Sequence, residues 1–183
     1  MRADDVKRYL KPYSIYQSRK TTINHAFAAA LAPHDTFELA RIAEALECLG
    51  QSIDAPLTCV YCDRPAETWD HLTSIVNGGQ LHGYGHQLDN LVPCCKTCNF
   101  RKGNKDWRRF LHEQVGESAE RSERESQIEE YLTTYASPID LNAARAQAED
   151  WQRYAELKTE VLRLMREAGE VATRLRMSIG RTP

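Results

Sequence analysis

The sequence predicts an α+β fold that is mostly helical, with a small mixed core between two helical regions. Apolar residues recur at helical spacing in both terminal regions of the 183-residue chain, whereas short β-branched and aromatic segments separated by glycine turns occupy the middle. We therefore expect an N-terminal helical region at 1–55, a compact core at 56–112 and a C-terminal helical region at 113–183.

The composition is that of a globular protein, with 42% hydrophobic and 27% charged residues. No apolar run approaches the ~20 residues that a membrane-spanning helix needs. The first residues, "MRADDVKRYLKPYS", carry acidic side chains and no apolar stretch, so they do not resemble a secretory signal. We expect a cytoplasmic protein, in which paired cysteines bind metal more often than they form disulfides.

Three helices are expected in the N-terminal region. The segments "DDVKRYLK" and "TINHAFAAALA" predict short helices, the second ended by Pro33. A firmer helix is predicted in "HDTFELARIAEALECLG", where Asp35 and Glu38 have the spacing of a capping box and Gly50 ends the apolar pattern.

The middle of the chain predicts a strand, a long loop, a second strand and a short helix. Strand patterns occur in "LTCVYC", "ETWDHLTSI" and "DNLVPCC", and "NGG" indicates a hairpin or loop. A short helix is expected in "KTCNFRKG", stopped by Gly103, and a further helix in "NKDWRRFLHEQV".

The C-terminal region predicts one helix in "ESAERSERESQIEEYLTTYA" and a longer one from about Asp140 to Arg176. Apolar residues in the longer helix alternate at intervals of three and four, as in a coiled coil: Tyr154, Leu157, Val161, Leu164, Ala168, Val171 and Leu175. Such a seam can pack against the N-terminal helices of the same chain. It can also form a homodimer or bind a partner protein.

Two Cys-x-x-Cys pairs are the most specific signal in the sequence: Cys59 with Cys62, and Cys95 with Cys98. Each pair can present two thiolates on a tight turn, and together they supply the four sulfur ligands that structural Zn²⁺ favours. The remaining cysteines, Cys48 and Cys94, are interpreted as buried apolar side chains.

The two knuckles are 32 residues apart, farther than in a plain zinc ribbon. Asp70, His71 and Asn90 lie between them, and Asn99 directly follows the last cysteine. A metal joining the knuckles would bring a carboxylate, an imidazole and two amides onto one surface.

The pattern "WDHL…GG…DNLVPCCKTCNFRKGNKDW" between two knuckles resembles the HNH family of endonucleases with a zinc-clipped ββα-metal fold. The resemblance covers roughly residues 56–112. It implies metal-dependent hydrolysis of DNA phosphodiester bonds that leaves 5′-phosphate and 3′-hydroxyl ends. By analogy with compact members of the family, it also implies a role in restriction or anti-phage defence.

The resemblance assigns His71 as general base, Asp70 and Asn99 as ligands of a catalytic metal, and Asn90 as the residue that steadies the site. Asn99 stands where the family name has histidine, which makes this an H-N-N variant. The oxygen ligands of Asp70 and Asn99 suit Mg²⁺, with Mn²⁺ as a substitute. The second ring nitrogen of His71 needs an acceptor, either a backbone carbonyl or the side-chain oxygen of Asn90.

The middle region is net positive, with seven basic and five acidic side chains. The residues expected to lie along a DNA backbone are Arg101, Lys102, Lys105, Arg108 and Arg109. A solvated helix face is the alternative for these residues. His82 and His86, in the glycine-rich loop, either contact DNA or are simply exposed.

Two other functions remain open at this level. A zinc-clipped module can bind nucleic acid without cutting it. A nuclease subunit can also be active only after its long C-terminal helix docks on a partner protein.

Overall fold

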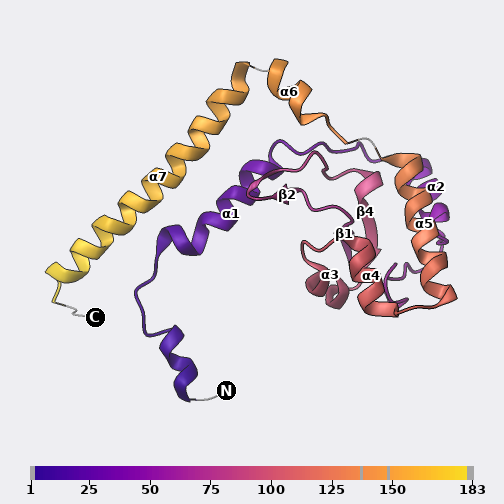
Figure 1. Cartoon of the computed structure of the whole chain (residues 1–183), viewed down its shortest axis with the longest axis horizontal. Helices are drawn as coiled ribbons and strands as arrows, with labels where there is room; N and C mark the ends of the chain where they lie inside the picture. Colours follow the sequence, from indigo (N-terminus) through magenta and orange to yellow (C-terminus); the bar gives the residue numbers. More distant parts are fainter. Residues whose placement is uncertain (1–2, 137, 148, 181–183) are drawn as a thin grey trace.

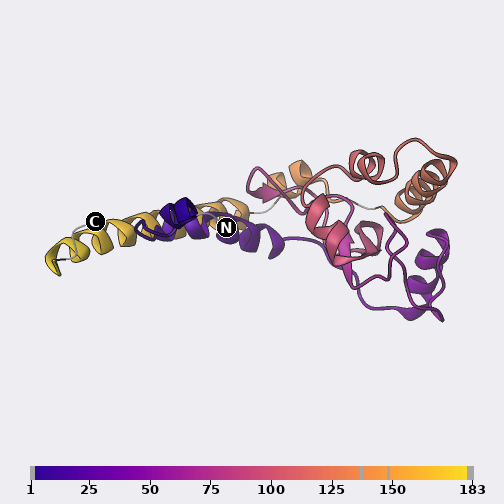
Figure 2. The ribbon, with the colours of Figure 1, turned by 90° about the horizontal axis from the view of Figure 1, so that it is seen from below.

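The computed structural model describes residues 3–136, 138–147 and 149–180. It is mostly helical, with a compact body and a long helical arm that extends from it (Figures 1 and 2). The elements in chain order are η1 (Ala3–Arg8), α1 (Ile15–Ala29), α2 (Leu39–Cys48), β1 (Thr68–His71), β2 (Val76–Asn77), β3 (Gln80–Leu81), η2 (Leu88–Asn90), β4 (Leu91–Cys94), α3 (Lys96–Lys102), α4 (Trp107–Val115), α5 (Ala119–Tyr135), α6 (Leu141–Gln147) and α7 (Glu149–Ser178).

The centre of the body is a two-stranded antiparallel sheet with a helix against it. Strand β1 pairs with β4 in a register that sets Asp70 opposite Val92 and His71 opposite Leu91. Helix α3 follows β4 directly and contacts β1. This strand–strand–helix arrangement is the core that the sequence predicts.

The predicted strand in "LTCVYC" is absent: the residues around Thr58 form an isolated bridge to Pro65. Instead, the chain turns tightly at the first knuckle, where Cys59 N donates to Arg64 O at 2.8 Å and Asp63 N donates to Cys59 O at 3.0 Å. These backbone groups, which a strand would use for pairing, therefore form hydrogen bonds within the turn that presents Cys59 and Cys62.

The "NGG" segment forms the hairpin that the sequence predicts. Asn77 pairs with Gln80, and the two residues between them, Gly78 and Gly79, have φ angles of 59° and 81°. Positive φ at both positions matches the two-residue hairpin turn that glycine favours.

The hydrophobic core of the body draws on helices from both ends of the chain. Its fully or nearly fully buried members come from α2, the first knuckle, the central sheet, α4 and α5, and include Leu49, Tyr61, Leu72, Val92, Phe110, Leu111, Ile128 and Tyr131. Helices α2 and α5 therefore pack on the same core as the central sheet.

The prediction of a capping box at the start of α2 is wrong. The helix begins at Leu39 after Glu38, and Glu38 makes no side-chain capping bond. Asp35 is used elsewhere, because its Oδ2 accepts a hydrogen bond from Leu88 N at 2.9 Å. The C-terminal expectation is confirmed: Gly50 has a φ of 70°, and Gln51 N donates back to Leu46 O at 2.9 Å.

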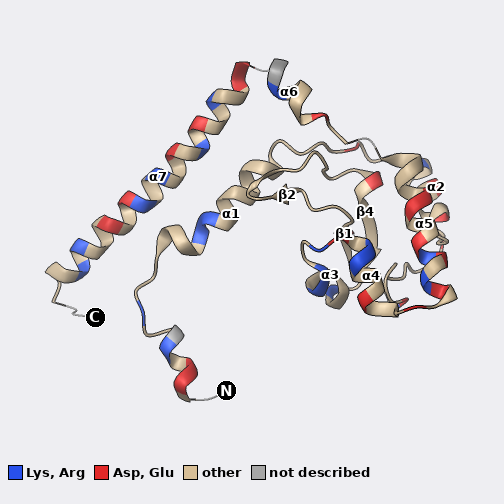
Figure 3. Cartoon of the chain, in the orientation of Figure 1, with Lys and Arg blue, Asp and Glu red and all other residues tan. Residues whose placement is uncertain are grey.

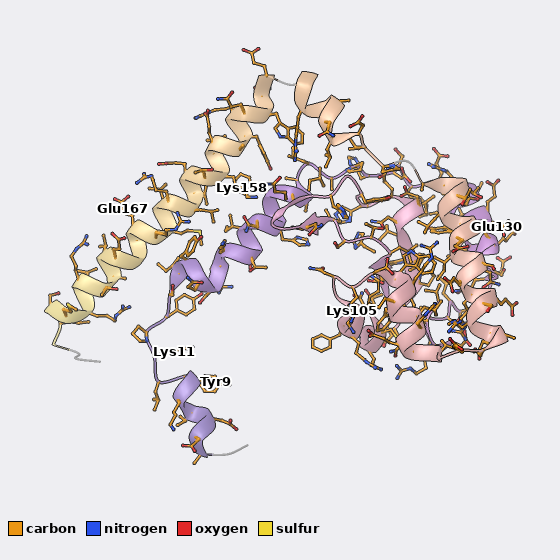
Figure 4. The ribbon with its side chains drawn as sticks, viewed as in Figure 1. Tyr9, Lys11, Lys105, Glu130, Lys158 and Glu167 are labelled. Atoms are coloured by element: carbon orange, nitrogen blue, oxygen red, sulfur yellow. The ribbon has the colours of Figure 1, made fainter. Side chains whose placement is uncertain are left out.

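The arm consists of α1 and α7, which lie side by side away from the central sheet (Figure 2). Tyr154 packs its ring on that of Phe27, with centroids 5.2 Å apart, and donates to the Phe27 carbonyl at 2.9 Å. Lys158, in the arm in Figure 4, donates to Gly79 O of the hairpin and so ties α7 to the body.

The single long helix expected from about Asp140 to Arg176 is two helices, α6 and α7, with residue 148 outside the described residues. Tyr154 packs within the chain, but four members of the predicted seam, Leu157, Leu164, Val171 and Leu175, are 40–58% exposed. Among the described residues, no helix is long and apolar enough to cross a membrane.

Candidate active site and metal centre

The four knuckle cysteines converge on one point. The ligand atoms of Cys59, Cys62, Cys95 and Cys98 all lie within 4.8 Å of one another. Cys62 Sγ is 3.7 Å from Cys95 Sγ and 3.5 Å from Cys98 Sγ. Sulfurs bound tetrahedrally at about 2.3 Å from Zn²⁺ lie about 3.8 Å apart, so this cluster can hold a metal such as zinc.

The neighbouring Cys94 is excluded from this set although its Sγ is 3.8 Å from that of Cys59. Cys94 is fully buried and donates to the Cys95 carbonyl at 3.3 Å. Cys48 is partly buried and packs against the core. The prediction of a buried apolar side chain is confirmed for Cys94, whereas Cys48 is only partly buried.

Arg64 places positive charge beside the cluster. Its Nε donates to Cys62 Sγ at 3.4 Å, and its Nη2 donates to Cys95 Sγ at 3.6 Å. Four thiolates around a divalent ion carry a net charge of about −2, so a guanidinium in this position offsets part of that charge.

Asp70 is buried in β1, with 4% of its surface exposed. Its Oδ2 accepts a hydrogen bond from the Tyr61 hydroxyl at 2.9 Å and pairs with Lys102 Nζ at 3.2 Å. Burial raises the pKa of the Asp70 carboxyl, and the ammonium of Lys102 opposes that rise. Burial and the charge of Asp70 in turn raise the pKa of Tyr61, so the phenol remains a donor.

The prediction that Lys102 contacts DNA is wrong in this structure. The residue is 1% exposed, and its Nζ donates to the His71 carbonyl at 2.7 Å as well as pairing with Asp70. A sequence signal for this position exists, because Lys102 follows the buried Cys98 by four residues and so lies on the same face of α3.

His71 ends β1 and is partly buried. Its Nε2 lies 3.1 Å from Nδ1 of His86, and the two rings meet edge to face with centroids 5.1 Å apart. Burial lowers the pKa of His71 to about 4, with a smaller contribution from the neighbouring His86. The His71 ring is therefore neutral at pH 7, as a general base must be.

Asn90 is fully buried and links two loops. Its Oδ1 accepts from Thr73 N at 2.8 Å, and its Nδ2 donates to Thr73 O at 2.9 Å and to Gly85 O at 3.1 Å. Both ends of the amide are thus occupied by backbone groups. Of the two acceptors expected for His71, a backbone carbonyl or the side-chain oxygen of Asn90, the structure shows neither on Nε2, because Nδ1 of His86 lies against that nitrogen.

Asn99 lies on α3, beside the strand that carries Asp70 and His71. Its Nδ2 donates to the Trp69 carbonyl at 3.2 Å. The contacts of Asp70 use Oδ2 and that of Asn99 uses Nδ2, so within the described residues each keeps one oxygen as a possible ligand. Carboxylate and amide oxygens are the donors that Mg²⁺ prefers, although the ammonium of Lys102 weakens cation binding at Asp70.

The other basic residues of this region are exposed and already paired, namely Arg101, Lys105, Arg108 and Arg109. Glu113 binds both Lys105 and Arg109, at 2.7 and 3.2 Å, and Glu129 binds Arg108 at 2.6 Å. Figure 3 shows acidic residues along α5, which packs against the helix α4 that carries Arg108 and Arg109. Arg101 donates to the Gln114 side-chain oxygen at 2.8 Å. DNA binding by these four residues stays a prediction, and it requires phosphates to replace these carboxylates and this amide oxygen.

Tyr61 and His86 are not among the residues that the sequence predicts for the site. Tyr61 lies inside the first knuckle, where only its place between two cysteines distinguishes it. His86 is exposed, as one interpretation of the loop expects, yet its ring contacts His71. No local pattern links residues 71 and 86, because a hairpin separates them.

Comparison with known proteins gives one family match. A family model described as HNH endonuclease matches residues 59–105. No curated protein and no solved structure matches the chain. The matched segment includes both knuckles, the central sheet and α3. We conclude that residues 59–105 form a domain of the HNH endonuclease family, which supports a nuclease or nucleic-acid-binding role.

Proposed function

We propose that this protein is a metal-dependent endonuclease that hydrolyses DNA phosphodiester bonds, with a structural Zn²⁺ on its four knuckle cysteines. The observation that carries the proposal is the juxtaposition of three groups in the family-matched segment. A neutral imidazole at His71, a buried carboxylate at Asp70 and the amide of Asn99 lie on or beside the end of β1.

In this mechanism His71 takes a proton from the attacking water. The water oxygen forms a bond to phosphorus, the bond from phosphorus to the 3′ oxygen breaks, and that oxygen leaves with the electron pair and is protonated by solvent. The products are a 5′-phosphate and a 3′-hydroxyl. An imidazole that is neutral at pH 7 is ready to accept this proton, and general-base assistance is worth about 10²–10⁴-fold.

Asp70 and Asn99 would hold the catalytic ion, Mg²⁺ or in its place Mn²⁺, through one oxygen each. Such an ion supplies positive charge to the phosphate oxygens and to the leaving oxygen. Lys102 and Tyr61 fix the Asp70 carboxylate in place, so the ligand needs no reorganisation before it binds.

The test is nicking of supercoiled plasmid DNA by the purified, zinc-loaded protein with Mg²⁺. We expect cutting by the wild type, loss of detectable cutting in His71→Ala, and unchanged zinc content and DNA binding in that variant. His82→Ala is the matched control, since His82 is an exposed histidine of the neighbouring loop. Full activity of His71→Ala, or full activity in chelator, would refute the proposal.

A zinc-clipped module that binds nucleic acid without cutting is the alternative function. It predicts DNA binding with no nicking by the wild type under any divalent ion. The shifted pKa of His71 favours the nuclease, because a module that only binds needs no neutral imidazole at this position.

We also propose that the arm has a partner, either a second copy of this chain or another protein. The supporting observation is the row of exposed apolar side chains on α7, Leu157, Leu164, Val171 and Leu175. Sedimentation at micromolar concentration separates these cases: a dimer supports self-association. A monomer that cuts only when a partner is added supports the subunit interpretation.

A cytoplasmic role in restriction or anti-phage defence is proposed by analogy with the family.

A further inference from the structure

His86 faces the ring that the proposed reaction uses as its base. The contact joins His71 Nε2 to His86 Nδ1 at 3.1 Å, a hydrogen-bond distance. One proton must lie between the two nitrogens, so either His71 or His86 is the donor. The choice decides which nitrogen of His71 is free to accept a proton.

The two arrangements differ in their chemical consequence. If His71 donates through Nε2–H, its Nδ1 keeps a lone pair and can take the proton of a water. If His86 donates, the Nε2 lone pair of His71 is occupied and its Nδ1 carries the hydrogen, so neither nitrogen can act as a base. Within the described residues, no hydrogen bond is made by His71 Nδ1.

The backbone around His86 is held on both sides. His86 N donates to Pro33 O at 2.8 Å, and Asp35 N donates to His86 O at 3.2 Å, so residues 33–35 run beside it as a short parallel bridge. Leu88 N is tied to the Asp35 carboxylate at 2.9 Å. A segment well outside the family-matched region therefore sets the position of this loop.

Gly85 allows that close approach. A Cβ at this position would lie 2.0 Å from the Pro33 carbonyl oxygen, so no other residue fits without moving the backbone. The Gly85 carbonyl accepts from Asn90 Nδ2 at 3.1 Å. The loop is thus clamped between Asn90 and the N-terminal segment, with the ring of His86 directed at His71.

We propose that His86 is a positioning residue, whose Nδ1 accepts a hydrogen bond from His71 Nε2–H and so holds His71 in the tautomer that leaves Nδ1 free. The inference rests on the proposed nuclease function of His71. It gives the N-terminal segment at 33–35 a defined task, which is to place the acceptor.

Two substitutions separate the hydrogen bond from packing. In His86→Asn, the side-chain oxygen lies as many bonds from Cα as Nδ1 does, so an acceptor is kept. His86→Leu has similar reach and no acceptor. His82→Leu is the matched control, because His82 is exposed in the same loop and its ring contacts Tyr84 at a centroid distance of 6.1 Å.

The first measurement is the imidazole ¹⁵N spectrum of the zinc-loaded full chain at neutral pH. We expect the His71 proton on Nε2 in the wild type, in His86→Asn and in His82→Leu, and a mixture of both tautomers in His86→Leu. A His71 proton on Nδ1 in the wild type, or an unchanged tautomer in His86→Leu, overturns the proposal. This readout does not depend on DNA cleavage.

The second measurement is single-turnover cleavage with Mg²⁺. We expect His86→Leu to lower the rate constant by about ten- to a hundredfold, less than loss of the base itself, with DNA affinity unchanged. His86→Asn should recover most of the rate, and His82→Leu should retain it. Equal losses in His86→Asn and His86→Leu would contradict an acceptor role. If the wild type shows the expected tautomer of His71 but does not cleave DNA, the nuclease function is contradicted. The hydrogen bond from His71 to His86 is then still supported.

Discussion

The body and the arm of this protein are held together in different ways. In the body, three polar side chains are at most 4% exposed and bind partners distant in sequence: Asp70 and Lys102 bind each other, and Asn90 binds the backbone of Thr73. In the arm, the described residues of α7 include none that is buried, and contacts such as that of Arg166 with Tyr16 lie at the surface. We therefore expect the stability of the body to depend on a few buried polar groups. The stability of the arm should depend on the summed contacts between the faces of α1 and α7.

Loss of the Zn²⁺ proposed for the four knuckle cysteines should destabilise the body more than any other single change. Structural zinc sites contribute about 10–16 kcal/mol of apparent binding free energy, which exceeds the net stability of most domains. We expect Cys95→Ser or a strong chelator to abolish cooperative unfolding and the near-UV signal of the buried Trp107. Zinc content and circular dichroism measure both effects.

The control for that prediction is Cys48→Ala, since Cys48 packs against the core outside the cluster. It should keep its zinc and a cooperative transition. A Cys95→Ser protein that melts like the wild type would show that the four sulfurs do not hold a structural ion.

Loss of the ammonium of Lys102 should have the next largest effect. Lys102→Met leaves the carboxylate of Asp70 buried without its cation, which typically costs about 3–5 kcal/mol. Lys105→Met is the matched control: the Lys105 side chain is 41% exposed, and its pair with Glu113 should be worth about 1 kcal/mol or less. Urea denaturation of both variants gives the comparison, and equal losses would argue against the buried pair.

The same two lysines show what the sequence could and could not predict. Local spacing was enough for the knuckles, the hairpin and the helix after the second knuckle, because each depends on residues a few positions apart. The spacing of Lys102 from Cys98 indicates the face of α3 on which Lys102 lies, but a row of basic residues does not tell which buried group one of them will bind. Lys102 does so because β1 places a carboxylate beside α3, and that pairing is a long-range event.

In the N-terminal region, the partner of Asp35 is also set by a long-range contact that local spacing does not predict. Its spacing to Glu38 fits a capping box, yet the helix begins later and the carboxylate binds Leu88 N, more than fifty residues away. His86 was likewise beyond prediction as a neighbour of His71, since its place depends on the clamp at residues 33–35. Where a side chain has both a local and a distant partner available, tertiary contacts decided the outcome.

Truncation of a leucine should destabilise the body much more than the arm. Leu111→Ala, at a fully buried position of α4, should lower the free energy of unfolding by about 2–5 kcal/mol. Leu164→Ala, at a position of α7 that is 50% exposed, should change it by about 0.5 kcal/mol or less. A large, concentration-dependent loss in Leu164→Ala would instead mean that another chain covers this face in solution.

The smallest expected effect is a difference in salt sensitivity between two shifted pKa values. The pKa of His71 is lowered to about 4 mainly by burial, whereas that of Tyr16 is lowered mainly by a hydrogen bond from Arg166 at the exposed arm. Salt weakens charged contacts at exposed sites, so at about 0.5 M salt the pKa of Tyr16 should return part of the way towards its ordinary value. Titration of ¹³C-labelled tyrosine, with Tyr16→Phe for assignment, measures this.

His71 should not respond in the same way, because salt does not restore water to the buried part of its ring. At about pH 5.5 an imidazole with an ordinary pKa is mostly protonated, but His71 should remain neutral at both low and high salt. Since its folded-state pKa lies below the unfolded value, His71 favours the folded state above about pH 6.5, and this contribution is lost as the pH falls towards 4. A His71 ring that protonates near pH 6.5, or whose pKa moves with salt as that of Tyr16 does, would mean that water and ions reach the site as freely as they reach the arm.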